Sequence, residues 1–186
     1  RISEDGSKWG NPIRVPVTAP HGPIKLSNGN LLYFGKAAVA DRNFHSELQN
    51  GMIRASVSKD GGLTWEVIGE VPIPEDTEAA NFHEPHAVEL KSGKIIGMIR
   101  YQHSQKIKNY DRFTMFQTES FDGGKTWSVA RPTGVSGSPP HLLRHSSGAI
   151  ICVYGYREIP YGQRAMISYD EGQTWDTDYI LRDDGP

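Results

Sequence analysis

Residues 120–127 read SFDGGKTW, and the pattern Ser-x-Asp-x-Gly-x-Thr-Trp in this stretch occurs three times in the chain. The other two complete copies are SKDGGLTW at residues 58–65 and SYDEGQTW at residues 168–175. A shortened copy, SEDGSKW, occupies residues 3–9. One such octapeptide could arise by chance, but three complete copies in 186 residues indicate a repeat architecture.

Each repeat unit predicts four antiparallel strands. The tryptophans that close the four copies stand 56, 62 and 48 residues apart, close to the length of one propeller blade with variable loops. Before each complete copy, two apolar segments flank a Ser-Gly or Asn-Gly turn, which is a β-hairpin signal, at residues 22–36, 85–100 and 140–154. A third strand leads into each copy and a fourth follows its tryptophan, as in residues 51–57 and 65–71.

The predicted fold is therefore all-β, a partial β-propeller over residues 1–186 with about three four-stranded blades. We place the blades at residues 18–73, 80–133 and 137–182, with residues 1–17 as the end of another. Three blades cannot close a ring, and an open edge exposes unpaired backbone groups. Further blades of the same chain or a second copy would close it, and we favour the first because both ends fall within or beside motifs.

The composition is that of an ordinary globular protein and excludes several function classes. The chain is 23% charged and 37% hydrophobic with a net charge of −2, which argues against nucleic acid as the main partner. No apolar run approaches the roughly 20 residues needed to span a membrane, so we expect no membrane insertion. No signal peptide is visible, and we expect no cofactor. The single cysteine, Cys152, lies in an apolar run and is interpreted as a buried core thiol.

The repeated octapeptide has the chemistry of a turn between the third and fourth strands. Its aspartate can accept backbone N–H hydrogen bonds within the loop, and its glycine supplies a position with positive φ. Its tryptophan can pack back over the blade while the indole N–H finds an acceptor. We interpret the aspartates as structural, because one active site does not need three copies, and a calcium loop would need more oxygen ligands.

This octapeptide is the Asp-box, or BNR repeat, and the chain resembles the sialidase (neuraminidase) superfamily, whose members are six-bladed propellers. The segment Glu84–Arg100 is similar to the part of sialidases in which a glutamate opens an inner strand and an arginine ends the next strand. The resemblance implies that Glu84 supports a tyrosine nucleophile and that Arg100 belongs to a triad holding the sugar carboxylate. Residues 141–157 resemble bacterial sialidase-like proteins of unassigned substrate. A secreted or periplasmic location is also implied.

Two parts of the sialidase pattern are missing from this chain. The Arg-Ile-Pro segment that supplies the first arginine of the triad is not present, and the corresponding strand here begins with His21-Gly-Pro. No tyrosine can be matched to the nucleophile. Either other blades carry these parts or the chemistry differs.

Three successive blades place a cation near the end of the second strand. Lys36 and Arg100 each stand seven residues after the hairpin glycine of their unit, and Arg157 stands nine residues after its own. Clustered cations suit an anionic ligand, and arginine binds a carboxylate through its bidentate fork. The alternative interpretation is that they are solvated charges at strand ends.

The starts of the inner strands carry His21, Glu84, His86 and His141. Their similar placement in three blades predicts a ligand-binding role, against the alternative of surface or hydrogen-bonded histidines. A zinc site is disfavoured, and we expect no metal, because the histidines come from different blades without a recognised ligand spacing.

The carboxylates and aromatic residues near these positions complete the candidate site. Glu84 is one candidate catalytic carboxylate, and Asp41 in the loop 40–45 is a candidate general acid, although an exposed loop aspartate is an open alternative. Tyr101 and Tyr156, beside the arginines, could stack on a sugar ring or pack in the core.

The functional hypothesis is a sialidase-like glycoside hydrolase acting on an anionic, possibly sialylated, glycan. Glu84 would stabilise an oxocarbenium-like transition state, while Arg100 and Arg157 hold a carboxylate. The alternative is a non-catalytic propeller that binds carbohydrate or protein, since fold alone does not decide function.

Overall fold

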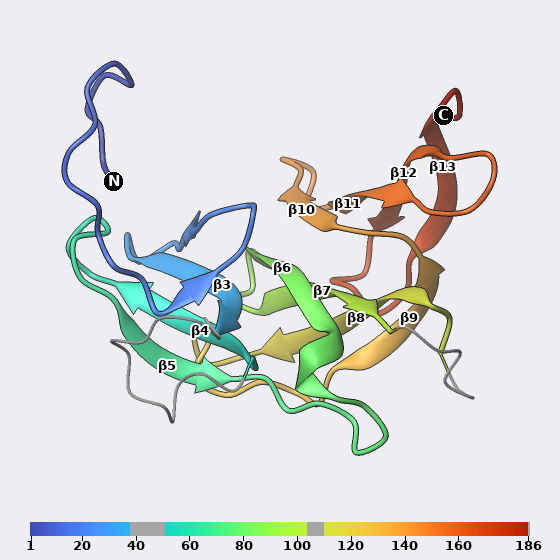
Figure 1. Cartoon of the computed structure of the whole chain (residues 1–186), viewed down its shortest axis with the longest axis horizontal. Coiled ribbons are helices and arrows are strands. Elements are labelled where there is room, and N and C mark those ends of the chain that lie inside the picture. Colours follow the sequence, from blue (N-terminus) through green and yellow to red (C-terminus); the bar gives the residue numbers. More distant parts are fainter. Residues whose placement is uncertain (38–50, 104–109, 186) are drawn as a thin grey trace.

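The structure is a computed structural model that describes residues 1–37, 51–103 and 110–185. Three antiparallel sheets lie side by side, with β3 to β5 on one side, β6 to β9 in the centre and β10 to β13 on the other side (Figure 1). We name these sheets blades A, B and C. Among the described residues, no helix is long and apolar enough to cross a membrane.

The inner strand of blade A is divided into two pieces. Both pieces pair with the same neighbouring strand, but at different registers. Its strands are β1 (Val17–Thr18), β2 (Ile24–Lys25), β3 (Leu31–Ala37), β4 (Ile53–Ser58) and β5 (Glu66–Glu70). The sequence predicts one continuous hairpin strand from residue 22. The interruption at residues 19–23 contains Pro20 and Pro23, which have no N–H to donate to the sheet.

Blades B and C are regular four-stranded meanders in sequence order. Blade B contains β6 (Phe82–Glu89), β7 (Ile95–Gln102), β8 (Phe113–Ser120) and β9 (Arg131–Ser136) and is preceded by the short 3₁₀ turn Ala79–Asn81. Blade C contains β10 (Pro140–Arg144), β11 (Ile150–Tyr156), β12 (Gly162–Ser168) and β13 (Asp176–Arg182). The predicted all-β class is confirmed, whereas the number of blades in a complete ring stays a prediction.

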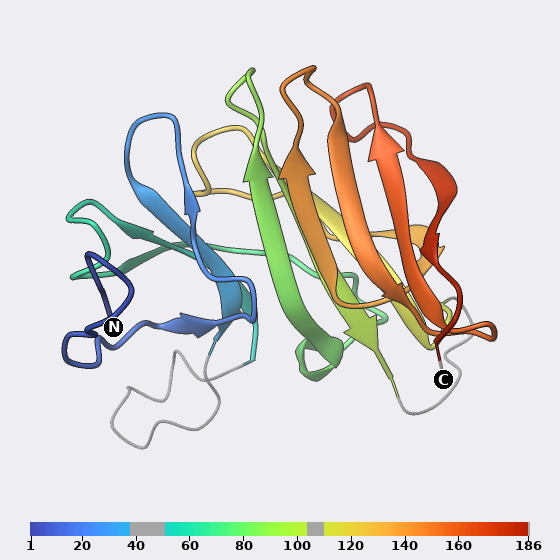
Figure 2. The same ribbon diagram turned by 90° about the horizontal axis from the view of Figure 1, so that it is seen from above.

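The inner strand of blade B, β6, lies next to the inner strand of blade C and to the second strand of blade A. Strand β6 contacts both β3 and β10, and Figure 2 shows β6 and β10 running side by side. Residues at the starts of these inner strands, far apart in sequence, are therefore brought close together in space.

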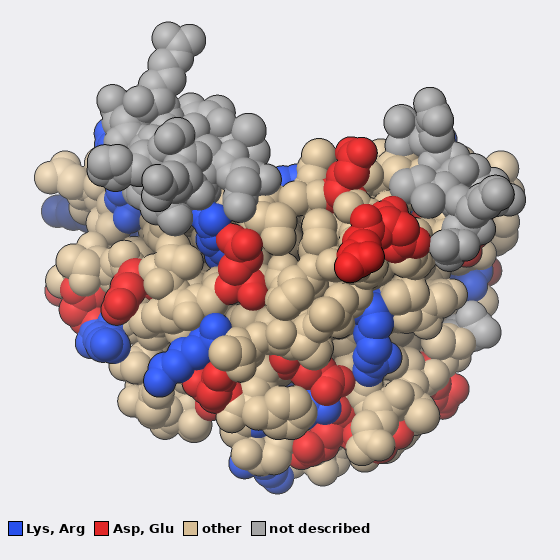
Figure 3. Space-filling view, turned by 90° about the horizontal axis from the view of Figure 1, so that it is seen from below, with Lys and Arg blue, Asp and Glu red and all other residues tan. Residues whose placement is uncertain are grey.

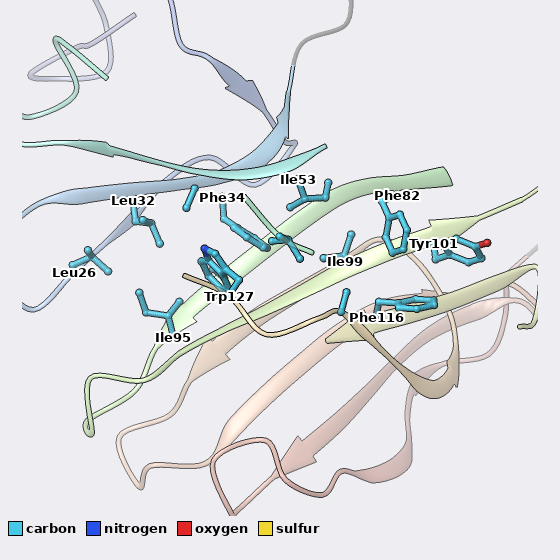
Figure 4. Packing of buried hydrophobic residues seen from close by; sticks show 14 residues of the cluster. Leu26, Leu32, Phe34, Ile53, Phe82, Ile95, Ile99, Tyr101, Phe116 and Trp127 are labelled. Atoms are coloured by element: carbon cyan, nitrogen blue, oxygen red, sulfur yellow. The ribbon is translucent and has the colours of Figure 1, made fainter. Parts of the chain in front are cut away.

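The hydrophobic core is divided into two layers between neighbouring blades. The layer between blades A and B includes Phe34, whose ring stacks on Trp127 with the centroids 4.6 Å apart (Figure 4). The layer between blades B and C contains Met98, Leu142 and Cys152. The thiol of Cys152 is fully buried, and this burial raises its pKa, as expected for an inert core cysteine.

The octapeptides form the predicted turns between the third and fourth strands. In blade B, Asp122 Oδ2 accepts the hydroxyl of Thr126 at 2.7 Å, and Oδ1 accepts the backbone N–H groups of Thr126 and Lys125 and the hydroxyl of Ser120. These hydrogen bonds lower the pKa of Asp122 to about 2. The stabilisation from the carboxylate is therefore present above its unfolded pKa and is lost as the pH falls towards 2.

The octapeptide turn of blade C also packs against the preceding blade, blade B. The indole N–H of Trp175 donates to Gln117 Oε1 of blade B at 2.7 Å, and the ammonium of Lys94 donates to the Glu171 carbonyl at 2.8 Å. Gly172 has φ +80°, and a Cβ there would lie 2.5 Å from the Ile96 side chain. This repeat therefore joins two blades as well as two strands.

Charges are mixed on the face seen from below, where Lys and Arg are interspersed with Asp and Glu (Figure 3). This mixture agrees with the small net charge of −2.

Candidate functional site

A cleft of about 290 Å³ lies between blades A and B and contains three of the residues proposed from the sequence. Blade A lines it with Thr18, Ala19, Pro20 and Lys36, and blade B with His83, Glu84, Arg100 and Gln102. The structure therefore brings together Lys36, Glu84 and Arg100, which are separated by up to 64 residues in the chain.

Glu84 sits at an irregularity in β6. The pairing of β6 with β7 shifts by one residue between His83 and His86, so that Glu84 and Pro85 form a β-bulge. The backbone of Glu84 has φ +43°, in the left-handed region that residues other than glycine rarely occupy. Bulges re-aim side chains, and strained conformations of this kind cluster at functional sites. Among the described residues, Glu171 in the octapeptide turn of blade C is the other non-glycine residue with positive φ, so Glu84 is the one of the two that lines this cleft.

The Glu84 carboxylate forms an ion pair with Arg100. Arg100 Nη1 donates to Glu84 Oε2, and Nη2 donates to Gln102 Oε1, so two side chains orient the guanidinium plane. The Glu84 side chain is 34% exposed and the Arg100 side chain is 21% exposed, so both remain accessible from the cleft. Arg100 Nε is buried and has no hydrogen-bond partner among the described residues. The guanidinium is therefore preorganised, with an unused buried donor.

Lys36 lies in the cleft, but its ammonium group is already occupied. Its Nζ donates to the carbonyl oxygens of Phe82 at 2.7 Å, Ala80 at 3.0 Å and Ala79 at 3.4 Å. It also lies 3.3 Å from His83 Nδ1. Burial lowers the pKa of Lys36. The prediction that Lys36 contacts the substrate therefore needs correction, because four protein acceptors share its three N–H donors.

Sequence reasoning missed His83 and Gln102. An ammonium can only donate, so His83 Nδ1 accepts from Lys36 and the ring proton is on Nε2. Burial, followed by the charges of Lys36 and Arg100, lowers the pKa of His83 and keeps the ring neutral. A period-2 argument could have found Gln102, because it lies two residues after Arg100 on the same strand and therefore on the same face.

The three predicted histidines converge beside this cleft. The rings of His86 and His141 are stacked with centroids 4.3 Å apart, and His21 lies 4.9 Å and 5.0 Å from them. His21 Nδ1 and His141 Nδ1 are 3.2 Å apart. His86 is buried and its Nδ1 accepts the Leu142 N–H at 2.9 Å. Among the described residues, no group of three or more His, Cys, Asp or Glu side chains is arranged to hold a metal ion.

The histidine cluster should make the stability of the protein pH-dependent. Burial, followed by the charges of His141 and His21, lowers the pKa of His86 from 6.5 to about 3. As the pH falls below 6.5, the unfolded state takes up a proton first, so the free energy of unfolding should fall by up to about 1.4 kcal/mol per pH unit. His21 and His141 face His86. Burial, followed by the charge of His141, lowers the pKa of His21 against the opposite effect of the Glu84 carboxylate, so His21 adds to this loss of stability.

We expect His86→Asn, which can still accept the Leu142 N–H, to show a shallower loss of stability between pH 7 and pH 4.5 than the wild type. Urea unfolding at several pH values measures this slope. His145→Asn is the matched control, because His145 is exposed and lies outside the cluster. Equal slopes in His86→Asn and the wild type would contradict the assignment.

Arg157 and Tyr156 lie apart from this cleft. They line a second pocket of about 380 Å³ with Ser138, whose carbonyl accepts Arg157 Nε at 3.1 Å. The guanidinium of Arg164 covers the Tyr156 ring at 3.4 Å. Arg100 lines the first cleft and Arg157 lines the second pocket. The structure therefore does not bring the two arginines together around one carboxylate, as predicted from the sequence.

The remaining two candidates are Tyr101 and Asp41. Tyr101 is fully buried and packs against Phe82 and Phe116, so it presents no face for sugar stacking, which corrects that part of the prediction (Figure 4). Asp41 lies outside the described residues, and its role as general acid stays a prediction.

Comparison with known proteins identifies the repeat. Residues 118–129 match the BNR/Asp-box repeat family. The chain carries an Asp-box repeat. It is also 25% identical over 187 residues to a sialidase of Vibrio cholerae, a match that covers 87% of this chain and 22% of the sialidase. The Asp-box chain therefore spans about a fifth of the length of the curated relatives it matches, and the expected resemblance to sialidases is confirmed.

Solved structures share the fold of the Asp-box chain. A protein of unknown function from Dyadobacter fermentans matches with a TM-score of 0.76 and 24% identity, over 100% of this chain and 52% of that protein. The Hadza microbial sialidase Hz136 matches with a TM-score of 0.64 and 18% identity, over 84% of this chain and 36% of the sialidase. The α-L-arabinanase of Penicillium chrysogenum gives 0.60 and 17%, over 91% of this chain and 51% of the enzyme. The fold is that of propeller glycoside hydrolases.

Proposed function

We propose that the whole protein hydrolyses a glycosidic bond in an anionic glycan, with the cleft between blades A and B as part of its active site. The observation that carries this proposal is the pairing of Glu84, held in a left-handed bulge, with a preorganised Arg100. Such strain is retained only where the surroundings enforce it, which favours function over chance.

The chemistry follows from the charges in the cleft. Glycoside hydrolysis develops positive charge on the sugar in an oxocarbenium-like transition state, and the Glu84 carboxylate would stabilise this charge. Arg100 would contribute its remaining donors to a carboxylate of the substrate. The described side chains of the cleft include two cations, Lys36 and Arg100, one anion, Glu84, and the neutral His83, so an anionic sugar is favoured.

A sialylated glycan is the first substrate to test, because the Vibrio cholerae relative is named a sialidase. The nucleophile would come from another part of the whole protein, since no tyrosine in this chain matches it. Asp41 as general acid, and His21, His86, His141, Arg157 and Tyr156 as substrate contacts, stay predictions. A non-catalytic carbohydrate-binding propeller is the second candidate. The ion pair with Arg100 favours it, because a carboxylate that is already paired has less charge to offer a reacting sugar.

We expect Arg100→Ala to lower kcat/KM for a fluorogenic sialoside by about 10–100-fold, the loss typical of a charge-assisted hydrogen bond. The assay uses the full-length protein. Arg144→Ala is the matched control, since Arg144 is an exposed arginine outside this cleft. Calorimetry with the same sugar distinguishes the two functions: binding without any hydrolysis by the wild type would support the non-catalytic module.

A further inference from the structure

We propose that Lys36 is the residue that positions Glu84, acting from blade A on the backbone of blade B. The inference rests on the proposed function, because positioning matters only if Glu84 acts on the substrate. Lys36 is on β3, and the groups it holds lie on the 3₁₀ turn Ala79–Asn81 and the first two residues of β6.

The contacts of Lys36 converge on the segment immediately before Glu84. The carbonyls of Ala79, Ala80 and Phe82 lie 3.4, 3.0 and 2.7 Å from its Nζ. The side chain of His83, the residue next to Glu84, lies 3.3 Å from the same atom. One ammonium therefore gathers four acceptors from four of the five residues that precede Glu84.

These four contacts of Lys36 explain how the unfavourable backbone conformation of Glu84 is maintained. A residue with φ +43° tends to relax towards the extended region unless its neighbours are held on both sides. Pro85 restricts the chain after Glu84, and β6 pairs with β7 at Phe82 and His83. Without the ammonium, the carbonyls of Ala80 and Phe82 would lose this donor, whereas the Ala79 carbonyl would keep the backbone N–H of Phe82, and the segment would be freer to rearrange.

The donor count separates positioning from substrate binding. An ammonium has three N–H groups and no acceptor, and the protein already offers Lys36 four acceptors. Lys36 thus has no donor left for a sugar. Arg100 differs, because its buried Nε has no partner among the described residues.

The test combines hydrogen exchange with kinetics on the full-length protein. Lys36→Met keeps the apolar stem and removes the ammonium, and Lys36→Ala leaves room for an added amine. Lys25→Met is the matched control, because Lys25 is an exposed lysine on β2 of the same blade, outside the cleft. Thermal unfolding shows whether each variant is folded.

For Lys36→Met we expect amides 79–84 to exchange at least about tenfold faster, with core amides of β7 unchanged. On a fluorogenic sialoside, kcat should fall about tenfold while KM changes less than about twofold. Ethylammonium, but not ethanol, should restore part of the kcat of Lys36→Ala, because the amine replaces both the charge and the donors. Lys25→Met should match the wild type.

Unchanged exchange in residues 79–84 would overturn the inference, and so would a rise in KM with kcat preserved, which would make Lys36 a direct substrate contact. If Lys36→Met does not fold, the exchange and amine response of Lys36→Ala decide the question. If the wild type cleaves no glycoside, the proposed function fails, and the exchange result still decides whether Lys36 holds the segment before Glu84.

Discussion

Replacing Glu84 with glutamine is expected to lower kcat for glycoside hydrolysis by about 10²–10³-fold, the usual loss when one preorganised electrostatic group of an active site is removed. Glutamine keeps the size of the side chain and removes its charge. The developing positive charge on the sugar then has no carboxylate beside it at this position, and Arg100 loses its ion-pair partner. Because the carboxylate matters most in the transition state, KM should change less than kcat.

Steady-state kinetics with a fluorogenic sialoside measure the effect, and thermal unfolding checks that the variant is folded. Glu66→Gln is the matched control, because Glu66 is an exposed glutamate on β5 that does not line the cleft. A kcat for Glu84→Gln within about twofold of the wild type would exclude an electrostatic role for this carboxylate.

Replacing Trp127 with alanine is expected to lower the free energy of unfolding by about 3–5 kcal/mol, as for other large aromatic residues truncated in a core. Trp127 is 7% exposed and stacks on Phe34 of blade A, with an interplanar angle of 28°. Its indole N–H donates to the Gly124 carbonyl at 2.9 Å. The substitution therefore opens a cavity between two blades and leaves a buried acceptor without its donor.

Urea unfolding followed by far-ultraviolet circular dichroism measures this loss without depending on tryptophan fluorescence. Trp9→Ala is the matched control: Trp9 closes the shortened copy of the same motif but is 60% exposed. Its removal should change stability by no more than about 0.5 kcal/mol. A cost below about 1 kcal/mol for Trp127→Ala would show that the Asp-box turn does not hold the blades together.

The fold was largely predictable because the repeat is built from local contacts. The hydroxyl and backbone donors of Asp122 all come from within four residues along the chain. A pattern that contains both partners of its hydrogen bonds can be recognised without knowing the rest of the molecule. The split of the inner strand of blade A was missed, because the predicted hairpin began at residue 22 and did not include β1, which pairs with the other end of β3.

The site was predictable only in part. Arg100 was proposed with Glu84 from the resemblance of residues 84–100 to sialidases, and it stands seven residues after Gly93. The structure places Arg100 and Glu84 in one cleft. The same count from Gly148 reaches Gly155, so Arg157 corresponds to the position of Gln102 in blade B and lies in another pocket. Similar residue types in successive blades therefore do not predict a shared site unless the residues also occupy equivalent positions on their strands.

The amino-acid sequence by itself determined the blades, the turns between their third and fourth strands, and the candidates Glu84 and Arg100. Only the tertiary structure decided what these candidates contact. The ammonium of Lys36 looked like a free cation at a strand end, yet it holds the carbonyls of Ala80 and Phe82 in the next blade. The physical reason is that the aspartate of the Asp-box finds its hydrogen-bond donors within eight residues, whereas the cleft forms only when different blades pack together.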